Sequence, residues 1–394
     1  MTELKSLQPK RASTQPALRR VTGYSAPEAR PAPALLRPVV HIVERMAPGG
    51  IETLARDLVR ESDGRARIIS LQGATDTLIA GWPALTPIAN VIEGMDAGGG
   101  LRPGLPRQIA RRLRTLRARA VVLHHIGPLL YGGLAARLAG VRRVIHVEHD
   151  VWHYEAYPRH RRLTVLAERL ARPTHVALSQ GAADVLRDML PRPCVDVIPT
   201  GIDLSLFTPE GRDAARAALG LAPDERAIGT VGRLVPVKGH ADLLAAFAQL
   251  AQTERLVVIG DGPEMAALRA QARSLGLGTR VTFLGHRDDV ADLLPGLDVF
   301  ALPSHAEGLP RSLLEAQACG VPVVATQVGS VAEAVCPETG HLVPPGDPDA
   351  LANALALALA APPSASPRGF VERAYDWERT LAAYRRLTGD VDDR

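Results

Sequence analysis

The sequence has few cysteines and few aromatic residues. Its three cysteines, Cys194, Cys319 and Cys336, stand far apart among 394 residues. This number and spacing exclude a disulfide framework and a Cys-x-x-Cys zinc ribbon, and they suit a reducing compartment. Because Phe, Trp and Tyr make up only 4% of the chain, its core must be built from Ala, Val, Leu and Ile.

Long apolar runs and several catalytic motifs are also missing. No run approaches the roughly 20 apolar residues that span a bilayer. The basic N-terminus has no apolar segment of the kind that a signal peptide requires. The chain contains no G-x-S-x-G, H-E-x-x-H or G-x-x-x-x-G-K-[ST] motif, and its Asp-x-Asp triplets lie in a turn and in the tail. We therefore expect a cytoplasmic chain with none of these three catalytic centres.

Lysine is rare, whereas arginine is common. Only three of the 46 basic residues are lysines, and only Lys238 lies outside the N-terminal segment. Residues 1–200 hold 29 basic and 17 acidic residues, whereas residues 201–394 hold 17 and 25. Two halves of opposite charge suggest two domains with different partners, and the length agrees with two domains of roughly 100–200 residues each.

Short apolar runs alternate with amphipathic, helix-length stretches from Val39 onward. Such alternation predicts an α/β fold with doubly wound parallel sheets. A turn-rich segment at 201–209 interrupts it, so we predict one domain over residues 37–200 and a second over 201–370. The predicted strands are Val39–Val43, Ile68–Leu71, Val121–His124, Val144–Val147, Val176–Ser179, Val195–Ile198, Ile228–Val231, Leu256–Ile259, Val281–Leu284, Val299–Leu302, Val321–Ala325 and His341–Val343.

The two ends of the chain differ from these domains. Residues 1–36 are rich in Pro, Ala and Arg and lack apolar periodicity, so we predict a disordered basic tail. Residues 371–394 contain an amphipathic stretch, Val371–Leu387, which we predict to be one helix that crosses back to the first domain. Ligands of parallel sheets bind outside the carboxyl ends of the strands, so two facing sheets would place them in a cleft.

The segment Gly232–Gly239 follows a predicted strand and carries both kinds of cation. Its glycines let the loop approach a ligand closely. Arg233 can hold an anion with two hydrogen bonds, whereas Lys238 is a compact point charge. The helix expected after Gly239 adds free N–H groups, so the segment predicts a diphosphate site. A solvated basic turn is the alternative.

A second segment, Glu307–Glu315, follows a later strand. Its first glutamate would stand in the loop before a helix and its last inside that helix. Two carboxylates so placed can contact two parts of one ligand, and the N–H groups of Gly308 and Leu309 would add a contact to an anion. For Glu315 alone, an ordinary solvated glutamate is the alternative.

The first half offers weaker signals at the ends of its strands. Gly50 follows the first strand, where a backbone can approach a phosphate or a sugar. His149 and Asp150 end another strand and would point into the cleft. A metal site that includes His146 is one interpretation, but residues i and i+3 of a strand face opposite sides, so we expect no metal there.

These segments together resemble glycosyltransferase family 4, the retaining glycosyltransferases of the GT-B fold. The resemblance covers residues 39–388 and is most specific from Ser304 to Ala325. That stretch holds two glutamates with seven residues between them, an apolar helix and a Cys-Gly-x-Pro-Val-Val-Ala strand. Thr200 departs from the family, which usually has Asn at this position.

The resemblance implies a role for each of these positions. Arg233 and Lys238 would bind the donor diphosphate and stabilise the leaving nucleoside diphosphate, Glu307 would contact the donor sugar, and Glu315 the ribose. His149 would lie near the sugar and the acceptor. Neither a metal nor another cofactor is implied. The other donor-binding positions would be Gly50, Gly232, His286, Arg287, Gly308 and Leu309.

Basic residues of the first domain suggest a further partner. Most of them are expected on one helix, where each would add about 1 kcal/mol of attraction to anionic lipid. A solvated helix face is the alternative, and nucleic acid is not expected because no aromatic residues lie among these arginines. The residues are Arg107, Arg111, Arg112, Arg114, Arg117 and Arg119, joined by Arg159, Arg161 and Arg162.

The sequence therefore predicts a metal-independent, retaining hexosyltransferase that moves a sugar from a nucleoside-diphosphate sugar to a lipid-linked or polysaccharide acceptor. Exopolysaccharide or lipopolysaccharide biosynthesis for the cell envelope is the setting that the resemblance suggests, in the cytoplasm or peripherally on the inner face of the cell membrane. Two alternatives stay open: a sugar-nucleotide 2-epimerase of the same fold, and a non-catalytic sugar-nucleotide-binding assembly partner.

Overall fold

The computed structural model describes residues 37–96, 98, 100, 102–192, 194–360 and 365–390. The predicted tail, residues 1–36, lies outside the described residues, as do residues 391–394 of the predicted terminal segment. No helix in the described part of the chain is both long enough and apolar enough to cross a membrane.

Seven parallel strands form the sheet of the first domain. They are β1 (Val39–Arg45), β2 (Ala66–Gln72), β3 (Ile92–Gly94), β4 (Ala120–His124), β5 (Arg143–Glu148), β6 (Thr174–Ala177) and β7 (Val195–Val197). Their order is β3-β2-β1-β4-β5-β6-β7. Because the order reverses between β1 and β4, a ligand crevice is expected outside the carboxyl ends of these two strands.

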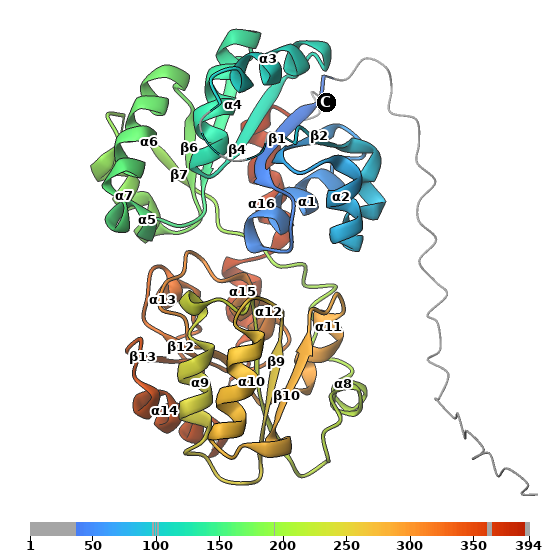
Figure 1. Ribbon diagram of the computed structural model, residues 1–394, viewed down its shortest axis with the longest axis vertical. Helices are drawn as coiled ribbons and strands as arrows, with labels where there is room; N and C mark the ends of the chain where they lie inside the picture. Colours follow the sequence, from blue (N-terminus) through green and yellow to red (C-terminus); the bar gives the residue numbers. More distant parts are fainter. Residues whose placement is uncertain are drawn as a thin grey trace, which may run out of the picture. The chain divides into compact units, whose positions relative to one another are not determined.

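Helices pack on both faces of this sheet (Figure 1). They are α1 (Gly50–Arg60), α2 (Thr75–Gly81), α3 (Leu105–Thr115), α4 (Ile126–Ala139), α5 (Trp152–Ala156), α6 (Pro158–Ala171) and α7 (Gln180–Met189), with a 3₁₀ segment at Pro83–Val91. Ile109 of α3 and Leu129 of α4 share a core with Val40 on one face. Leu54 of α1 packs with Val43 on the other face. The alternation of side chains along β1 thus supplies both cores.

Six parallel strands form the sheet of the second domain. They are β8 (Arg226–Val231), β9 (Glu254–Ile259), β10 (Val281–Gly285), β11 (Val299–Leu302), β12 (Val323–Thr326) and β13 (His341–Val343). Their order is β10-β9-β8-β11-β12-β13, so the reversal lies between β8 and β11. The loops that follow these two strands are the predicted binding segments, which places both of them at the expected crevice.

The helices of the second domain also cover both faces. They are α8 (Arg212–Leu219), α9 (His240–Phe247), α10 (Met265–Ser274), α11 (Val290–Leu293), α12 (Arg311–Ala318), α13 (Val331–Ala334) and α14 (Pro348–Ala360), with 3₁₀ segments at Pro236–Lys238, Gly278–Arg280 and Leu294–Gly296. Figure 1 shows α9 and α10 side by side over one face, where Leu243 and Leu268 pack with Ile228. Leu313 of α12 packs with Phe300 on the other face.

The two doubly wound sheets confirm the predicted fold class. Every predicted strand is present, with ends that differ by a few residues. Ser179, for example, is not part of β6 but caps α7, because its side chain accepts a hydrogen bond from the backbone N–H of Ala182. The sequence pattern missed β3, since three residues, Ile92–Gly94, are too short to show a period.

The prediction of a single helix at Val371–Leu387 is wrong. The structure has two helices, α15 (Arg368–Ala374) and α16 (Trp377–Thr388). The chain leaves helical geometry between them because Tyr375 and Trp377 pair through their backbones with Ile202. The Asp376 side chain then accepts a hydrogen bond from the N–H of Glu378 and caps α16.

The two terminal helices touch different domains. Tyr375, just after α15, donates a hydrogen bond from its hydroxyl to the carbonyl of Glu333 in the second domain. The Arg385 side chain of α16 donates to the Glu61 carbonyl in the first domain, and α16 contacts β5. The chain therefore returns to the first domain at its end, as Figure 1 shows for α16 behind α1.

The predicted basic helix is shorter than expected. α3 ends at Thr115, because Arg117 has a φ of 51° and turns the chain. Arg119 lies beyond the turn, where its guanidinium is 2.8 Å from the Asp390 carboxylate. Arg112 pairs with Glu93. Only part of the predicted set therefore remains on an exposed helix face.

Candidate active site

Close backbone contacts fix the loop after β8. The N–H of Leu234 donates to the Asp261 carbonyl at 2.9 Å, and the N–H of Glu264 donates to the Leu234 carbonyl at 3.0 Å. A Cβ atom on Gly262 would lie 2.4 Å from the same Leu234 carbonyl, and one on Gly239 would lie 1.9 Å from the carbonyl of Pro303. Only glycine permits these approaches, so the two loops of the crevice are locked together.

Lys238 and Glu307 meet at the centre of this crevice. The Lys238 Nζ donates to Glu307 Oε1 at 2.6 Å, and the Ser304 hydroxyl donates to the same oxygen at 2.6 Å. The Glu307 residue is only 8% exposed. The sequence placed these two residues in separate segments, and the structure makes them direct partners.

Arg233 lies at the rim of the same loop. Its side chain is exposed, and its positive charge acts on the carboxyl of Glu52, in the first turn of α1. Burial raises the pKa of the Glu52 carboxyl, and a backbone N–H and Arg233 oppose that rise only in part. Glu52 reaches back over Gly49, whose Cβ would lie 2.6 Å from Glu52 Oε2. The glycine turn of the first domain and the arginine of the second therefore face each other.

Gly50 and Gly232 have open surroundings. A Cβ atom on either would meet nothing within 4 Å. Gly50 is the first residue of α1, and Gly232 directly follows β8. Leu309 is buried in the core beneath the second loop, so its side chain is structural and only its backbone can serve a ligand.

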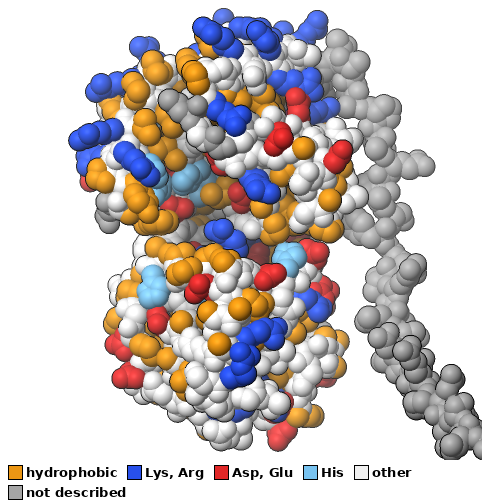
Figure 2. Space-filling model, in the orientation of Figure 1, with side chains coloured by type: hydrophobic (Ala, Val, Ile, Leu, Met, Phe, Trp, Pro, Cys, Tyr) orange, Lys and Arg blue, Asp and Glu red, His pale blue; other side chains and the backbone are white. Residues whose placement is uncertain are grey.

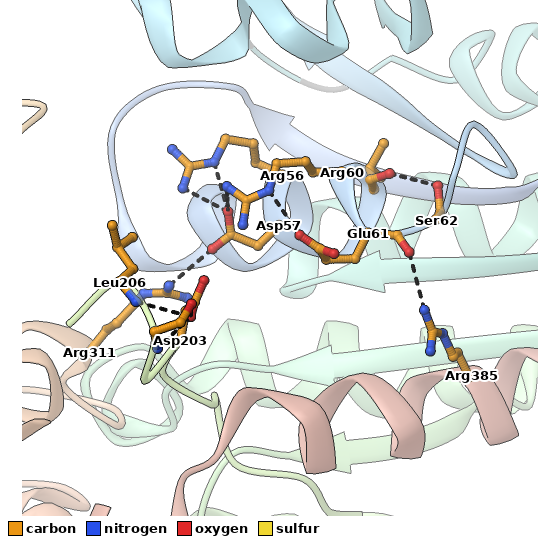
Figure 3. Close-up of polar contacts among 11 residues, drawn as sticks. Arg56, Asp57, Arg60, Glu61, Ser62, Asp203, Leu206, Arg311 and Arg385 are labelled. Carbon is orange, nitrogen blue, oxygen red and sulfur yellow. Dashed lines mark hydrogen bonds and ion pairs between the residues drawn. The ribbon is translucent and has the colours of Figure 1, made fainter. Parts of the chain in front are cut away.

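Glu315 is engaged by an arginine that the sequence did not single out. The Arg311 Nε donates to Glu315 Oε1 at 2.8 Å, and its terminal nitrogen donates to Asp57 Oδ2 at 3.0 Å. Burial alone would lower the pKa of Arg311, but Glu315 and Asp57 outweigh it and raise the pKa. Figure 3 shows Arg311 reaching Asp57, which also faces Arg56 and Arg60 on α1.

A cavity of about 260 Å³ lies beside this ion pair. Gly49, Asp57 and Trp82 line it from the first domain, and Glu315 lines it from the second. His286 and Arg287 are also among its lining residues. They fold onto their own loop, His286 against Asp288 at 3.2 Å and Arg287 against Asp289.

His149 belongs to a chain of buried imidazoles in the first domain. Its Nε2 lies 3.1 Å from Nδ1 of His124, whose Nε2 lies 3.1 Å from Nδ1 of His41. Burial lowers the pKa of His149 to about 3, and that of His41 also to about 3. His149 is therefore neutral at ordinary pH and can form hydrogen bonds without carrying charge.

A second group gathers around His125, which follows β4. Its Nε2 lies 3.6 Å from Glu148 Oε1 and 4.0 Å from Asp150 Oδ2, and Asp150 Oδ1 lies 2.9 Å from His153 Nδ1. Burial alone would lower the pKa of His125, but Glu148 and Asp150 outweigh it and raise the pKa to about 9. His146 points elsewhere, to His175 at 3.0 Å. The triad of His146, His149 and Asp150 is therefore not assembled.

The two domains touch at the site itself. A Cβ atom on Gly308 would lie 2.0 Å from the His149 carbonyl. Nearby, the hydroxyls of Ser179 and Ser330 lie 2.5 Å apart, and Glu333 accepts hydrogen bonds from the N–H groups that open α7. Figure 2 shows histidine side chains in the hollow between the two halves.

Sequence reasoning missed several of these residues. Arg311, Asp57 and Glu52 occupy ordinary helix positions, and nothing in their local pattern marks them. His125 and His153 are separated by α4, β5 and the loops on either side of β5, so their proximity depends on the sheet order. Their one sequence signal was the density of histidines at strand ends.

Two family models match this chain, one in each domain. The model of "Glycosyl transferases group 1" matches residues 211–377, and that of "Glycosyltransferase Family 4" matches residues 48–206. The putative glycosyltransferase EpsF of Bacillus subtilis is 33% identical over 309 residues, which cover 73% of this chain and 78% of that protein. A D-inositol 3-phosphate glycosyltransferase of Mycolicibacterium gilvum is 41% identical over 206 residues, half of this chain and 46% of the relative. The chain thus spans about half the length of the latter kind of relative.

Solved structures share the fold over nearly the whole chain. HepE of Anabaena, solved with UDP and glucose, superimposes with a TM-score of 0.77 at 23% identity, covering 90% of this chain and 100% of that chain. The sucrose-phosphate synthase of Thermosynechococcus elongatus gives a TM-score of 0.76 at 25% identity, with the same coverage. With two matched family models, a relative aligned over most of its length and a GT-B arrangement of two parallel sheets, the chain belongs to glycosyltransferase family 4.

Proposed function

We propose that this protein transfers a sugar, with retention of configuration, from a nucleoside-diphosphate sugar to a lipid-linked or polysaccharide acceptor. The observation that supports it most is the Lys238–Glu307 pair at 2.6 Å, set between the switch-point loops of the second sheet. Arg233 lies at the rim of the same crevice. This is a cationic cradle with a buried carboxylate, which suits a phosphorylated sugar.

The leaving diphosphate is the main electrostatic demand of such a reaction. As the bond from the anomeric carbon to the phosphate oxygen breaks, negative charge grows on that oxygen. Lys238 and Arg233 would bind the diphosphate and stabilise this charge, which fixed cations in a closed site do more effectively than water. Lys238 would have to turn from Glu307 to the phosphate, and the Glu307 carboxylate would then accept hydrogen bonds from sugar hydroxyls.

Retention requires the acceptor oxygen to attack from the face that the phosphate leaves. The acceptor forms its bond to the anomeric carbon, and its proton passes to an oxygen of the departing phosphate. His149, which burial keeps neutral, would position a sugar hydroxyl by a hydrogen bond. A neutral imidazole adds no positive charge that would slow the departure of the diphosphate from the sugar.

The nucleoside would occupy the cavity beside Arg311. Glu315 would accept hydrogen bonds from the ribose hydroxyls while Arg311 holds its carboxylate in place. His286 and Arg287 would border the base, and the backbone of Gly50, Gly232, Gly308 and Leu309 would approach the phosphates and the sugar. UDP is the first nucleotide to test, because HepE was solved with UDP.

Nucleotide binding provides the first test. Thermal unfolding is measured for the parent and for Lys238→Ala with UDP, GDP and ADP, each with and without EDTA. A ligand at 100 times its dissociation constant adds about 2.7 kcal/mol, which raises the midpoint by several degrees. We expect one nucleotide to raise the parent's midpoint without metal and to lose that effect in Lys238→Ala. A shift that persists in the variant would contradict the diphosphate role.

Product analysis separates transfer from its alternatives. Incubation with the identified donor and a lipid-linked sugar should give free nucleoside diphosphate and a longer glycan in equal amounts. An epimerase would return an altered nucleotide sugar and leave the acceptor unchanged. A binding partner without activity would return both molecules unchanged.

An anionic membrane is the surface that we propose for the lipid-linked acceptor. Besides Arg159, Arg161 and Arg162, which are exposed on α6, this helix leaves Leu166 52% exposed and Leu170 54% exposed. Leucines among arginines suit an interfacial helix better than arginines alone, because the leucines enter the acyl boundary while the arginines meet phosphates. Figure 2 shows hydrophobic and basic side chains interspersed on the first domain. The protein would then act peripherally, on the cytoplasmic face.

Vesicle flotation tests this surface. We expect salt-sensitive binding to vesicles with anionic lipid and none to neutral vesicles, and Leu166→Ser with Leu170→Ser should weaken it. Leu357→Ser, on the 65% exposed leucine of α14, is the matched control in the second domain. No binding to anionic vesicles at low salt would remove this part of the proposal.

A further inference from the structure

His125, Asp150 and His153 come together at the carboxyl edge of the first sheet. His125 follows β4, whereas Asp150 and His153 lie three residues apart between the end of β5 and α5, so the sheet order brings two separate segments to one point. One ligand atom of each, two imidazole nitrogens and a carboxylate oxygen, lies within 4.8 Å of the others. We propose that these three side chains bind a divalent transition-metal ion, separate from the donor cradle.

The donor set has the chemistry of such a site. Two imidazole nitrogens and one carboxylate oxygen form the ligand set of many zinc and iron centres, which keep further positions open. Bonds of about 2.0–2.2 Å to a shared ion require ligand atoms some 3–4 Å apart. Asp150 Oδ1 lies 2.9 Å from His153 Nδ1, and Asp150 Oδ2 lies 4.0 Å from His125 Nε2, so the two imidazoles flank one carboxylate at close to this spacing.

Other carboxylates besides that of Asp150 lie around His125. Glu148 is wholly buried, with Oε1 3.6 Å from the same His125 nitrogen. Glu44 and Glu52 also act electrostatically on His125, and Arg233 is the cation that faces Glu52. These carboxylates favour a cation at this position, and a divalent ion bound to His125 would take the place of the imidazole's proton.

The backbone holds His125 in an unusual conformation. Its φ of 74° combines with a ψ of 179°, a conformation that residues other than glycine rarely adopt. The N–H of His125 donates to the Val147 carbonyl at 2.9 Å, which fixes this turn beside β5. Surrounding structure must support such strain, and strained residues gather at functional sites.

The position is accessible and lies beside the proposed acceptor site. The side chains of His125 and Asp150 are 27% and 23% exposed, whereas that of His153 is 4% exposed. An ion held here could therefore take a water molecule or an oxygen of an incoming ligand in its open position. The inference does not depend on sugar transfer, because metal binding is measured without any substrate.

Calorimetry with ZnCl₂ on the full chain, freed of metal beforehand, tests the inference. We expect about one tight ion per chain, and Co²⁺ should give the visible absorption of a site with nitrogen ligands. His153→Ala and Asp150→Asn should each weaken binding at least about 10-fold, since each removes a ligand. His341→Ala, at an exposed histidine of β13, is the matched control and should bind as the parent does.

His125→Gly guards against a variant that fails to fold, because glycine adopts this backbone conformation without strain. It should retain the parent's circular dichroism and lose tight Zn²⁺ binding. Absence of Zn²⁺ and Co²⁺ binding to the parent would overturn the inference and leave an ion-pair network. Equal binding by the parent, His153→Ala and His125→Gly would also overturn it, by placing the metal elsewhere.

Discussion

The two domains carry different chemistry at the same edge of the same kind of sheet. In the second domain, a lysine and a buried glutamate form one close pair, fixed by loops whose glycines touch neighbouring backbone. In the first domain, histidines bond to one another, and burial keeps several of them neutral. We interpret the carboxyl edge of the second domain's sheet as suited to a fixed anion, and that of the first domain's sheet as suited to neutral hydroxyl groups.

The difference also separates local motifs from assembled sites. The proposed donor cradle comes from two continuous segments, each following one strand. The hydrogen-bonded histidines of the first domain come from β1, β4, β5, β6 and α5, so their group exists only once the sheet has formed. Four experiments test this contrast.

Removing Arg311 should have the largest effect, because it joins the domains. Arg311→Ala leaves Glu315 and Asp57 without the cation between them, and the loss of one partner of a buried ion pair costs about 3–5 kcal/mol. Urea unfolding should show this loss, together with weaker nucleotide binding. Asp184→Asn, which breaks an exposed pair with Arg187, is the control and should cost below about 1 kcal/mol. A loss for Arg311→Ala as small as that of the control would contradict the link.

Gly308→Ala should separate nucleotide binding from transfer. The new Cβ would lie 2.0 Å from the His149 carbonyl, so the domains must move apart, while the second domain keeps its own loops. A misplacement of about 1 Å can cost about 100-fold in turnover. We expect that loss with the nucleotide-induced thermal shift retained. Gly104→Ala, where a Cβ meets nothing within 4 Å, should leave turnover unchanged. Full turnover in Gly308→Ala would show that the domains need not approach so closely.

Lys238→Ala tests the binding edge of the second domain alone. A charge-assisted hydrogen bond contributes about 1.5–3 kcal/mol, so turnover should fall about 10–100-fold or more. Nucleoside diphosphate release at saturating donor and acceptor measures it. Arg273→Ala, at an exposed arginine of α10, controls for the loss of one positive charge. Turnover near the parent value in Lys238→Ala would refute its role.

Mild acid should destabilise the first domain more than the second, with a smaller effect than the substitutions above. Burial lowers the pKa of His41 to about 3 and of His175 to about 4 in the first domain, and of His240 to about 4 in the second. Between these values and about 6.5 the unfolded chain binds more protons at these three positions, so their contribution to stability is complete above about pH 6.5 and falls as the pH drops. Each group contributes up to about 1.4 kcal/mol per pH unit.

The first domain should therefore lose more stability between pH 6.5 and pH 4. Pulsed hydrogen exchange at one fixed labelling pH, after equilibration in urea at each pH, reads the two domains separately. His175→Gln should reduce the slope of the first domain only, and His240→Gln that of the second only. Equal slopes in the parent would show that the first domain's histidines do not act as separate buried groups.

Much of the fold followed from local pattern. Apolar runs such as Val121–His124 and Val299–Leu302 are buried on both faces, and only parallel strands between helix layers bury a short run in this way. Loops with glycines after such strands predicted the two segments that hold Lys238 and Glu307. The break between α15 and α16 could not be predicted, because it depends on a backbone pairing with Ile202, far away in the sequence.

The two doubly wound sheets and the family could be read from the sequence, because each depends on residues within single strand–loop–helix units. The pairing of Lys238 with Glu307, the Asp57–Arg311–Glu315 link and the group at His125 emerge only in the folded structure. These contacts join residues from different units, and their energies depend on burial and on distances that sheet order alone sets. Charge and hydrogen bonding act through space, so a chain reveals them only when it is folded.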